Sequence, residues 1–118
     1  MSQIKDKKIA VFEVLTGRDL NSNEIKIKRY IHGHDGLNAY VRECSEKEKN
    51  EAKAAGVEQS VVLKVNYNER LKVGHFIDFR GEVLIIQSID GFEFYKRDLT
   101  LRAARVKAEV YNHEEYTE

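Results

Sequence analysis

The segment HGHDG carries the residues of this sequence whose types and spacing come closest to a metal site. His32 and His34 are two positions apart, so on a strand both side chains lie on one face, and Asp35 adds a carboxylate oxygen. A zinc site needs three or four ligands, however, and the two remaining histidines have no diagnostic spacing from this segment. Gly33, Asp35 and Gly36 also suit a loop between two strands. We therefore expect an inter-strand loop that needs no metal, with a metal-dependent enzyme at His32, His34 and Asp35 as the weaker alternative.

Cys44 is the single cysteine, and it lies directly before a segment with the pattern of a helix. The positive end of a helix dipole lowers the pKa of a thiol, so a reactive cysteine is one interpretation; a partly buried bystander is the favoured one. A single cysteine forms no disulfide within the chain, which fits a reducing cytoplasm. The sequence also lacks a GxSxG nucleophile motif and the phosphate loops GxGxxG and GxxxxGK. We expect neither an enzyme nor a cofactor.

Basic residues gather near the end of the sequence, in a stretch where only Asp98 carries the opposite charge. They are Lys96, Arg97, Arg102, Arg105 and Lys107. On a strand such a stripe could contact the phosphates of a nucleic acid. It could equally be a solvated outer face, or pair with an acidic partner or a neighbouring subunit. The chain has 20 basic and 20 acidic residues, so no net field attracts DNA. A small nucleic-acid-binding barrel is the second hypothesis, with DNA facing Lys96, Arg97, Arg102 and Arg105.

Most of the sequence has the two-residue period of strands. Residues 24–31, for example, place Ile25 and Ile27 on one face and Lys26 and Lys28 on the other. Gly81 lies between two apolar runs and can supply the positive φ of a tight turn. Strands are predicted at 8–15, 24–31, 37–43 and 59–67, in a hairpin over 75–90, and in a long strand over 95–110.

The period changes to that of a helix over residues 45–56. Ser45 and Glu48 have the spacing of a capping box, Gly56 ends the segment, and only alanines are available to anchor this surface helix. With 118 residues and 13.7 kDa, the chain is one domain. We expect it to be mostly β: a small antiparallel β-barrel of six or seven strands with one short surface α-helix. The acidic tail from about residue 109 is expected to be disordered, and no apolar stretch is long enough to span a bilayer.

The second half of the chain, residues 58–106, carries a recognisable order of features. A strand ending in Tyr67 is followed by a polar LKVG link, a hairpin of the form IxFRGxxxxIxSI, and a charged strand with an RxLxL core. The positions that carry this order are Tyr67, Leu71, Gly74, Ile77, Phe79, Gly81, Ile86, Ile89, Arg97, Leu99 and Leu101. In these features the segment resembles the phage head–tail joining proteins, also called head-closure or stopper proteins. The chain departs from that family before the helix, where Ala39-Tyr40 stands in place of a frequent tryptophan-alanine pair.

The resemblance implies a small β-barrel protein that joins the portal ring of a phage capsid to the tail, forms a ring there and helps to retain packaged DNA. Its partners would be portal or adaptor ring and tail proteins, further copies of itself and DNA in the channel, with no membrane. It would assemble in the host cytoplasm and remain in the virion connector, and prophage copies are common in the family. Contacts to partners or neighbouring subunits are expected at Arg18, Asp19, Asn21, Asn23, His32, Gly33, His34, Asp35, Gly36, Lys47 and Lys49.

Overall fold

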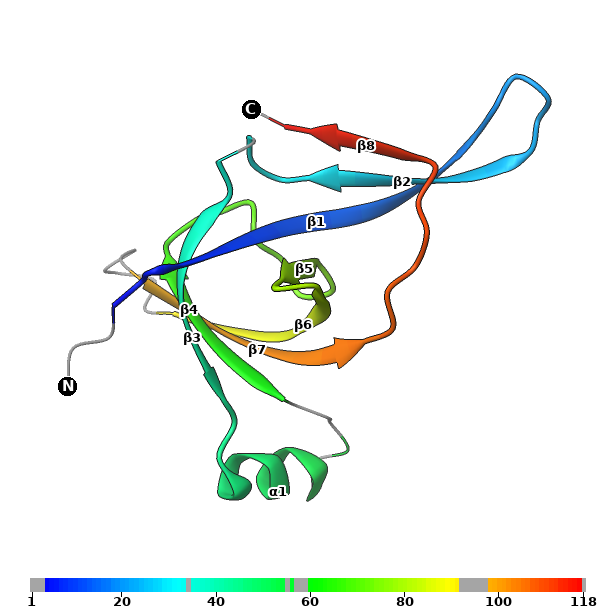
Figure 1. The fold of residues 1–118 in the computed structure, drawn as a ribbon. Helices are drawn as coiled ribbons and strands as arrows, with labels where there is room; N and C mark the ends of the chain where they lie inside the picture. Colours follow the sequence, from blue (N-terminus) through cyan, green and yellow to red (C-terminus); the bar gives the residue numbers. More distant parts are fainter. Residues whose placement is uncertain (1–3, 34, 55, 57–59, 92–97, 118) are drawn as a thin grey trace.

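A computed structural model describes residues 4–33, 35–54, 56, 60–91 and 98–117 (Figure 1). Within these residues the chain forms eight strands and one helix. In chain order they are β1 (Lys7–Arg18), β2 (Glu24–Tyr30), β3 (Leu37–Glu43), α1 (Glu46–Ala54), β4 (Val61–Asn66), β5 (Phe76–Phe79), β6 (Glu82–Gly91), β7 (Asp98–Val106) and β8 (His113–Tyr116). The predicted fold class is confirmed, with eight strands in place of six or seven. No helix in this described part of the chain is long and apolar enough to cross a membrane.

Six of the strands close into a barrel-like body. Hydrogen bonding runs from β1 through β3, β4, β7, β6 and β5 and returns to β1, and each neighbouring pair is antiparallel. Strand β1 completes the circuit because its residues 7–9 pair with β3 and its residues 10–12 pair with β5. Closure of this kind removes the exposed sheet edges that would otherwise pair with other chains.

An apolar cluster fills the barrel-like body. Its fully buried side chains come from all six strands and include Val11, Leu63, Ile77, Leu84 and Leu101. Burying one such side chain contributes about 1.5–3 kcal/mol. The stability of the chain therefore resides chiefly in this body.

Two local sequence signals form the structures that they predict. Strands β5 and β6 join through Arg80 and Gly81, whose φ angles of 50° and 80° are those of a type I′ turn. At the start of α1, the Ser45 hydroxyl accepts the backbone N–H of Glu48 at 3.2 Å. Glu48 Oε1 in turn accepts the backbone N–H of Ser45 at 3.0 Å. The helix thus begins with the expected reciprocal capping box.

Beyond Phe12, β1 leaves the body and pairs with β2 in a long hairpin, here called the arm (residues 12–30). Figure 1 shows the arm projecting from the body, with the loop between β1 and β2 at its far end. Strand β8 lies on the outer side of β2 and runs parallel to it. Disorder was predicted for the tail from about residue 109, and the structure places part of this tail along β2. The outer edge of β2 offers unpaired backbone groups and basic side chains, and the acidic tail complements both.

Candidate functional site

The tip of the arm is a turn that its own polar groups hold in place. Asp19 Oδ1 accepts hydrogen bonds from the backbone N–H groups of Asn21 and Asn23, both at 2.9 Å. Ser22 has a φ of 62°, and the Arg18 guanidinium donates to its carbonyl at 3.0 Å. The four contact residues predicted in this loop therefore build one braced turn.

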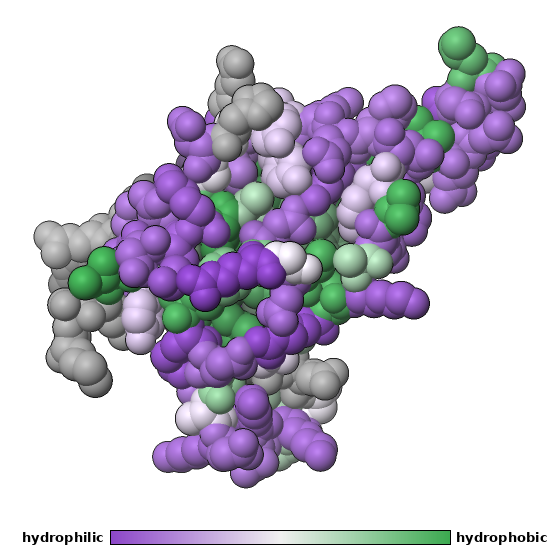
Figure 2. Space-filling view, viewed as in Figure 1, coloured by the Kyte–Doolittle hydropathy of each residue, from purple (hydrophilic) through white to green (hydrophobic). Residues whose placement is uncertain are grey.

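This turn presents Leu20 to solvent. The Leu20 side chain has a relative exposure of 104%. Figure 2 shows the end of the arm as hydrophilic atoms around a small apolar group. An apolar side chain on a braced turn can enter a pocket of a partner with little further loss of conformational entropy. Sequence reasoning identified the polar residues of the loop and missed Leu20, although a leucine between Asp19 and Asn21 was a visible signal.

The HGHDG segment connects β2 to β3 as an inter-strand loop. Its His32 is buried, and Nε2 accepts the backbone N–H of Val11 at 2.9 Å. Nδ1 lies 2.6 Å from the carbonyl oxygen of Gly33, so the proton of the imidazole resides on Nδ1. Both ring nitrogens are occupied within the chain, and the structure places His32 inside, not among the exposed contact residues where it was predicted. Asp35 is exposed, and His34 lies outside the described residues.

Gly36 fixes the other end of this loop. Its φ is +74°, and a Cβ at this position would lie 2.8 Å from the carbonyl oxygen of Ile9. Only glycine combines that backbone conformation with so close an approach. Within the described residues, no group of three or more His, Cys, Asp or Glu is arranged to hold a metal ion. The contacts of the loop favour a fixed connection between strands.

The two described members of the predicted DNA-facing set already have carboxylate partners. Arg102 lies 3.4 Å from both Glu48 and Asp90. Arg105 forms an ion pair with Glu43, and its Nε lies 3.1 Å from Glu82. The hydrogen bonds with Glu43 and then Glu82 raise the pKa of Arg105 further above its ordinary value. A phosphate would have to compete with these carboxylates. Lys96 and Arg97 lie outside the described residues.

Polar bonds attach α1 to the neighbouring strands. Glu48 receives two hydrogen bonds from the Arg42 guanidinium, at 2.6 and 3.1 Å, and Arg102 of β7 approaches the same carboxylate. The Arg42 hydrogen bonds, followed by the Ser45 backbone N–H, lower the pKa of Glu48 to about 2. Ala52 is the buried residue of the helix. The helix is therefore anchored by charge where the sequence suggested weak attachment, and it leaves the predicted contact residues Lys47 and Lys49 exposed.

Cys44 is buried beside the helix start. Its backbone N–H donates to the carbonyl of Ser60 at 2.9 Å. Burial, and then the nearby Glu48 carboxylate, raise the pKa of the Cys44 thiol. Burial and the raised pKa favour the interpretation of Cys44 as a bystander over that of a reactive nucleophile.

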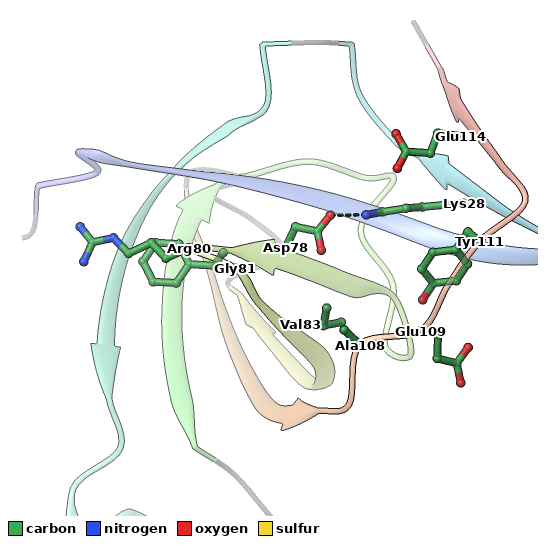
Figure 3. Close-up of a pocket in the computed structure, with 10 residues that line it drawn as sticks. Lys28, Asp78, Arg80, Gly81, Val83, Ala108, Glu109, Tyr111 and Glu114 are labelled. Atoms are coloured by element: carbon green, nitrogen blue, oxygen red, sulfur yellow. Dashed lines mark hydrogen bonds and ion pairs between the residues drawn. The ribbon is translucent and has the colours of Figure 1, made fainter.

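A buried lysine, which the alternation of β2 placed on the outer face, lies at the base of the arm. Lys28 forms an ion pair with Asp78 of β5, and its Nζ is 4.3 Å from the ring centroid of Phe12 and 5.0 Å from that of Tyr30. Burial lowers the pKa of Lys28, but its interactions with Asp78 and Tyr30 outweigh this effect and the pKa is raised. Figure 3 shows Lys28 directed at Asp78. This fixed cation joins the arm to the body.

A hollow of about 400 Å³ lies beside this ion pair. Its lining includes Arg80, Glu109, Tyr111 and Glu114 (Figure 3). The one buried charge that reaches it, on Lys28, is already neutralised by Asp78. The hollow therefore lacks the unpaired buried group that would mark a ligand site. The geometry of the described residues points to binding through the arm and its tip.

Comparison with other proteins identifies the architecture. No model of a known protein family matches this chain, and no curated protein matches its sequence. The structure is similar to the solution structure of protein SF1141 from Shigella flexneri 2a, with a TM-score of 0.63 over 84% of this chain and 90% of that one. The two sequences are 19% identical, so the likeness establishes the fold alone. A solved protein thus shares the barrel-like body of this chain.

Proposed function

We propose that this protein is a structural head–tail connector of a phage or prophage, of the head-closure type. In this proposal it docks on the portal ring, links the capsid to the tail and helps to retain the packaged DNA. Docking takes place in the host cytoplasm during assembly, and the protein then remains in the virion. The resemblance of residues 58–106 to head–tail joining proteins is the starting point, and a barrel-like body suits that family.

The observation that carries the proposal is the arm. It is a hairpin that leaves a closed body, and its braced tip exposes Leu20. An apolar anchor of this kind, surrounded by polar groups, is typical of the centre of a protein–protein contact. Because the tip is already ordered, docking loses little conformational entropy, and more of the favourable contact energy contributes to the affinity. The predicted contact residues Arg18, Asp19, Asn21 and Asn23 would form the polar rim.

Co-sedimentation with assembled portal rings encoded at the same genetic locus tests this proposal. We expect saturable binding, with the free protein monomeric. Leu20→Ser should weaken docking about tenfold or more, because it removes the apolar anchor. Val73→Ser is the matched control, since Val73 is an exposed apolar residue (61%) in the connection before β5. It should change docking by less than about twofold. Absence of saturable binding at several salt concentrations would overturn the proposal.

The nucleic-acid hypothesis receives less support. Arg102 and Arg105 each contact two carboxylates, so their charge is largely compensated on the surface. Binding to short DNA that weakens with salt, and that is lost in the Arg102→Ala/Arg105→Ala variant, would instead favour this second function.

A further inference from the structure

The outer edge of β2 holds the C-terminal strand β8 in parallel pairing. The register runs from Ile27 opposite His113 to Tyr30 opposite Tyr116. On either side of β8 the backbone contacts continue. The N–H of Asn112 donates to the carbonyl of Lys26 at 2.9 Å, and the N–H of Thr117 donates to the carbonyl of Tyr30 at 3.0 Å. The β2 edge therefore pairs with an extended segment from Lys26 to Tyr30.

Side chains on this edge match the tail in charge and in shape. Lys26 Nζ lies 3.0 Å from Glu109, and the Arg29 guanidinium lies 3.0 Å from Glu115. The rings of Tyr30 and Tyr116 stack with centroids 4.6 Å apart and an interplanar angle of 14°. Basic side chains thus select an acidic segment, and Tyr30 selects an aromatic residue at its end. Together they form an acceptor site for an acidic, extended peptide.

The tail is attached to this site mainly by exposed interactions, and its half-buried Tyr111 packs against Phe12. No residue of 107–117 is buried, and all four residues of β8 are exposed. Exposed ion pairs contribute little each, about 0–1 kcal/mol. A segment held in this way opens more readily than the strands of the body, where apolar side chains are fully buried. The acceptor site can therefore exchange its occupant without unfolding the body.

We propose that in the assembled connector the β2 edge accepts the C-terminal strand of a second copy of this chain. This inference rests on the proposed function, because it supplies the contact between neighbours in the ring. A second copy is complementary to this edge, because its tail makes the same hydrogen bonds, ion pairs and tyrosine stack that the tail makes within one chain. No new contact is needed, which is the general basis of strand exchange between identical chains.

The connection between β7 and β8 sets the geometry of the exchange. Residues 107–112 link Val106 to His113, and when extended they span roughly 20 Å. The acceptor site of a neighbour must therefore lie within that distance of the end of β7. Donor and acceptor are different surfaces, so each copy can give its tail to the next, and such a head-to-tail contact forms a ring when the rotation between neighbouring copies closes.

Cysteine cross-linking in the full-length chain tests the exchange. Half-buried Arg29 and exposed Glu115 are partners in the β2–β8 register, so cysteines at these two positions fall close enough for a disulfide. Two variants are mixed, one with Arg29→Cys and the other with Glu115→Cys, and both also carry Cys44→Ala. The mixture is oxidised in two conditions, on portal rings and at high protein concentration in solution. Mixing Arg29→Cys with Val73→Cys is the control. We expect the first mixture to give at least about tenfold more cross-linked dimer than the control.

A second experiment uses a variant that carries both cysteines in one chain. When this variant is oxidised on portal rings, we expect a ladder of covalently joined copies. Cross-links confined to single chains, although the protein sediments with portal rings, would overturn the exchange and leave the proposed function standing. Cross-linked dimers in solution without any docking on rings would support the exchange and overturn the connector function. Intrachain cross-links in solution with no docking would overturn both.

Discussion

The barrel-like body and the arm share the strand β1 but are stabilised in different ways. In the body, Ile9 and Val11 of β1 join a cluster in which Leu63 and Leu101 are fully buried. In the arm, every residue of β1 from 13 to 18 is half-buried or exposed. Here the shape depends on the backbone ladder with β2, the turn at Asp19 and the edge pairing with β8.

This difference separates stability from recognition within one small chain. The body concentrates apolar burial, which is the largest favourable contribution to folding. Beyond its buried base, the arm is ordered by hydrogen bonds that contribute modestly to the free energy of unfolding but define its shape. Because the arm contributes little to the free energy of unfolding, it can carry an exposed apolar group such as Leu20. Substitutions in the body and in the arm should therefore have different effects on stability.

The largest contrast is expected from matched leucine truncations. Leu101→Ala should lower the free energy of unfolding by about 2–5 kcal/mol, because it removes a fully buried side chain and leaves a cavity. Leu15→Ala in the half-buried arm should lower it by less than half as much. Urea denaturation at neutral pH measures both. Equal losses of free energy of unfolding in the two variants would show that the arm belongs to the cooperative core. The body and the arm would then not be stabilised in different ways.

His32→Ala tests the junction between the two regions. The substitution removes the acceptor of the buried Val11 N–H, so we expect a loss of about 1–3 kcal/mol in the free energy of unfolding. His113→Ala is the control, since His113 is exposed, and it should change the free energy of unfolding by less than about 0.5 kcal/mol. If the two variants unfold at the same urea concentration, the His32 hydrogen bond is not a stabilising feature of the junction.

Sequence reasoning succeeded where neighbouring residues decide the structure. The capping box at Ser45 and Glu48 and the turn at Gly81 each depend on a few adjacent positions. The alternation of strands also gave the fold class, because one face of each strand had to be apolar. These features follow from local geometry.

The failures are contacts between residues far apart in the chain. The ion pair of Arg29 with Glu115 spans 86 positions, and no local pattern indicates that an acidic tail will add a strand to β2. Lys28 was placed on an outer face by alternation, but Asp78 and three aromatic rings cover it. His32 was predicted to contact a partner, because sequence alone does not reveal that its side-chain nitrogen replaces a backbone carbonyl as hydrogen-bond acceptor. Tertiary context decided each case.

A smaller effect, and one that depends on pH, is expected at the helix. Glu48 has a pKa of about 2 in the folded chain and an ordinary value of 4.5, so its ionised form stabilises the folded state. That contribution is complete above the ordinary pKa and is lost as the pH falls through the folded value. The difference in free energy of unfolding between the natural chain and Glu48→Gln should therefore shrink between pH 4.5 and about 2. Urea denaturation at neutral pH and at about pH 3 measures it. A constant difference would mean that ionised Glu48 does not attach α1 to the strands.

The smallest effect on stability is expected at the tip of the arm, from Asp19→Ala. This change removes the acceptor of two exposed hydrogen bonds, so the free energy of unfolding should fall by less than about 1 kcal/mol. Amide hydrogen exchange at Asn21 and Asn23 should nevertheless become faster, because their N–H groups lose the Asp19 carboxylate. Asp35→Ala, at an exposed aspartate in the other loop, should leave exchange at the tip unchanged. Docking on portal rings should weaken in Asp19→Ala although Leu20 is intact, since the turn must then be ordered during binding. Unchanged docking would show that the exposed leucine alone, and not the braced turn, carries recognition by the arm.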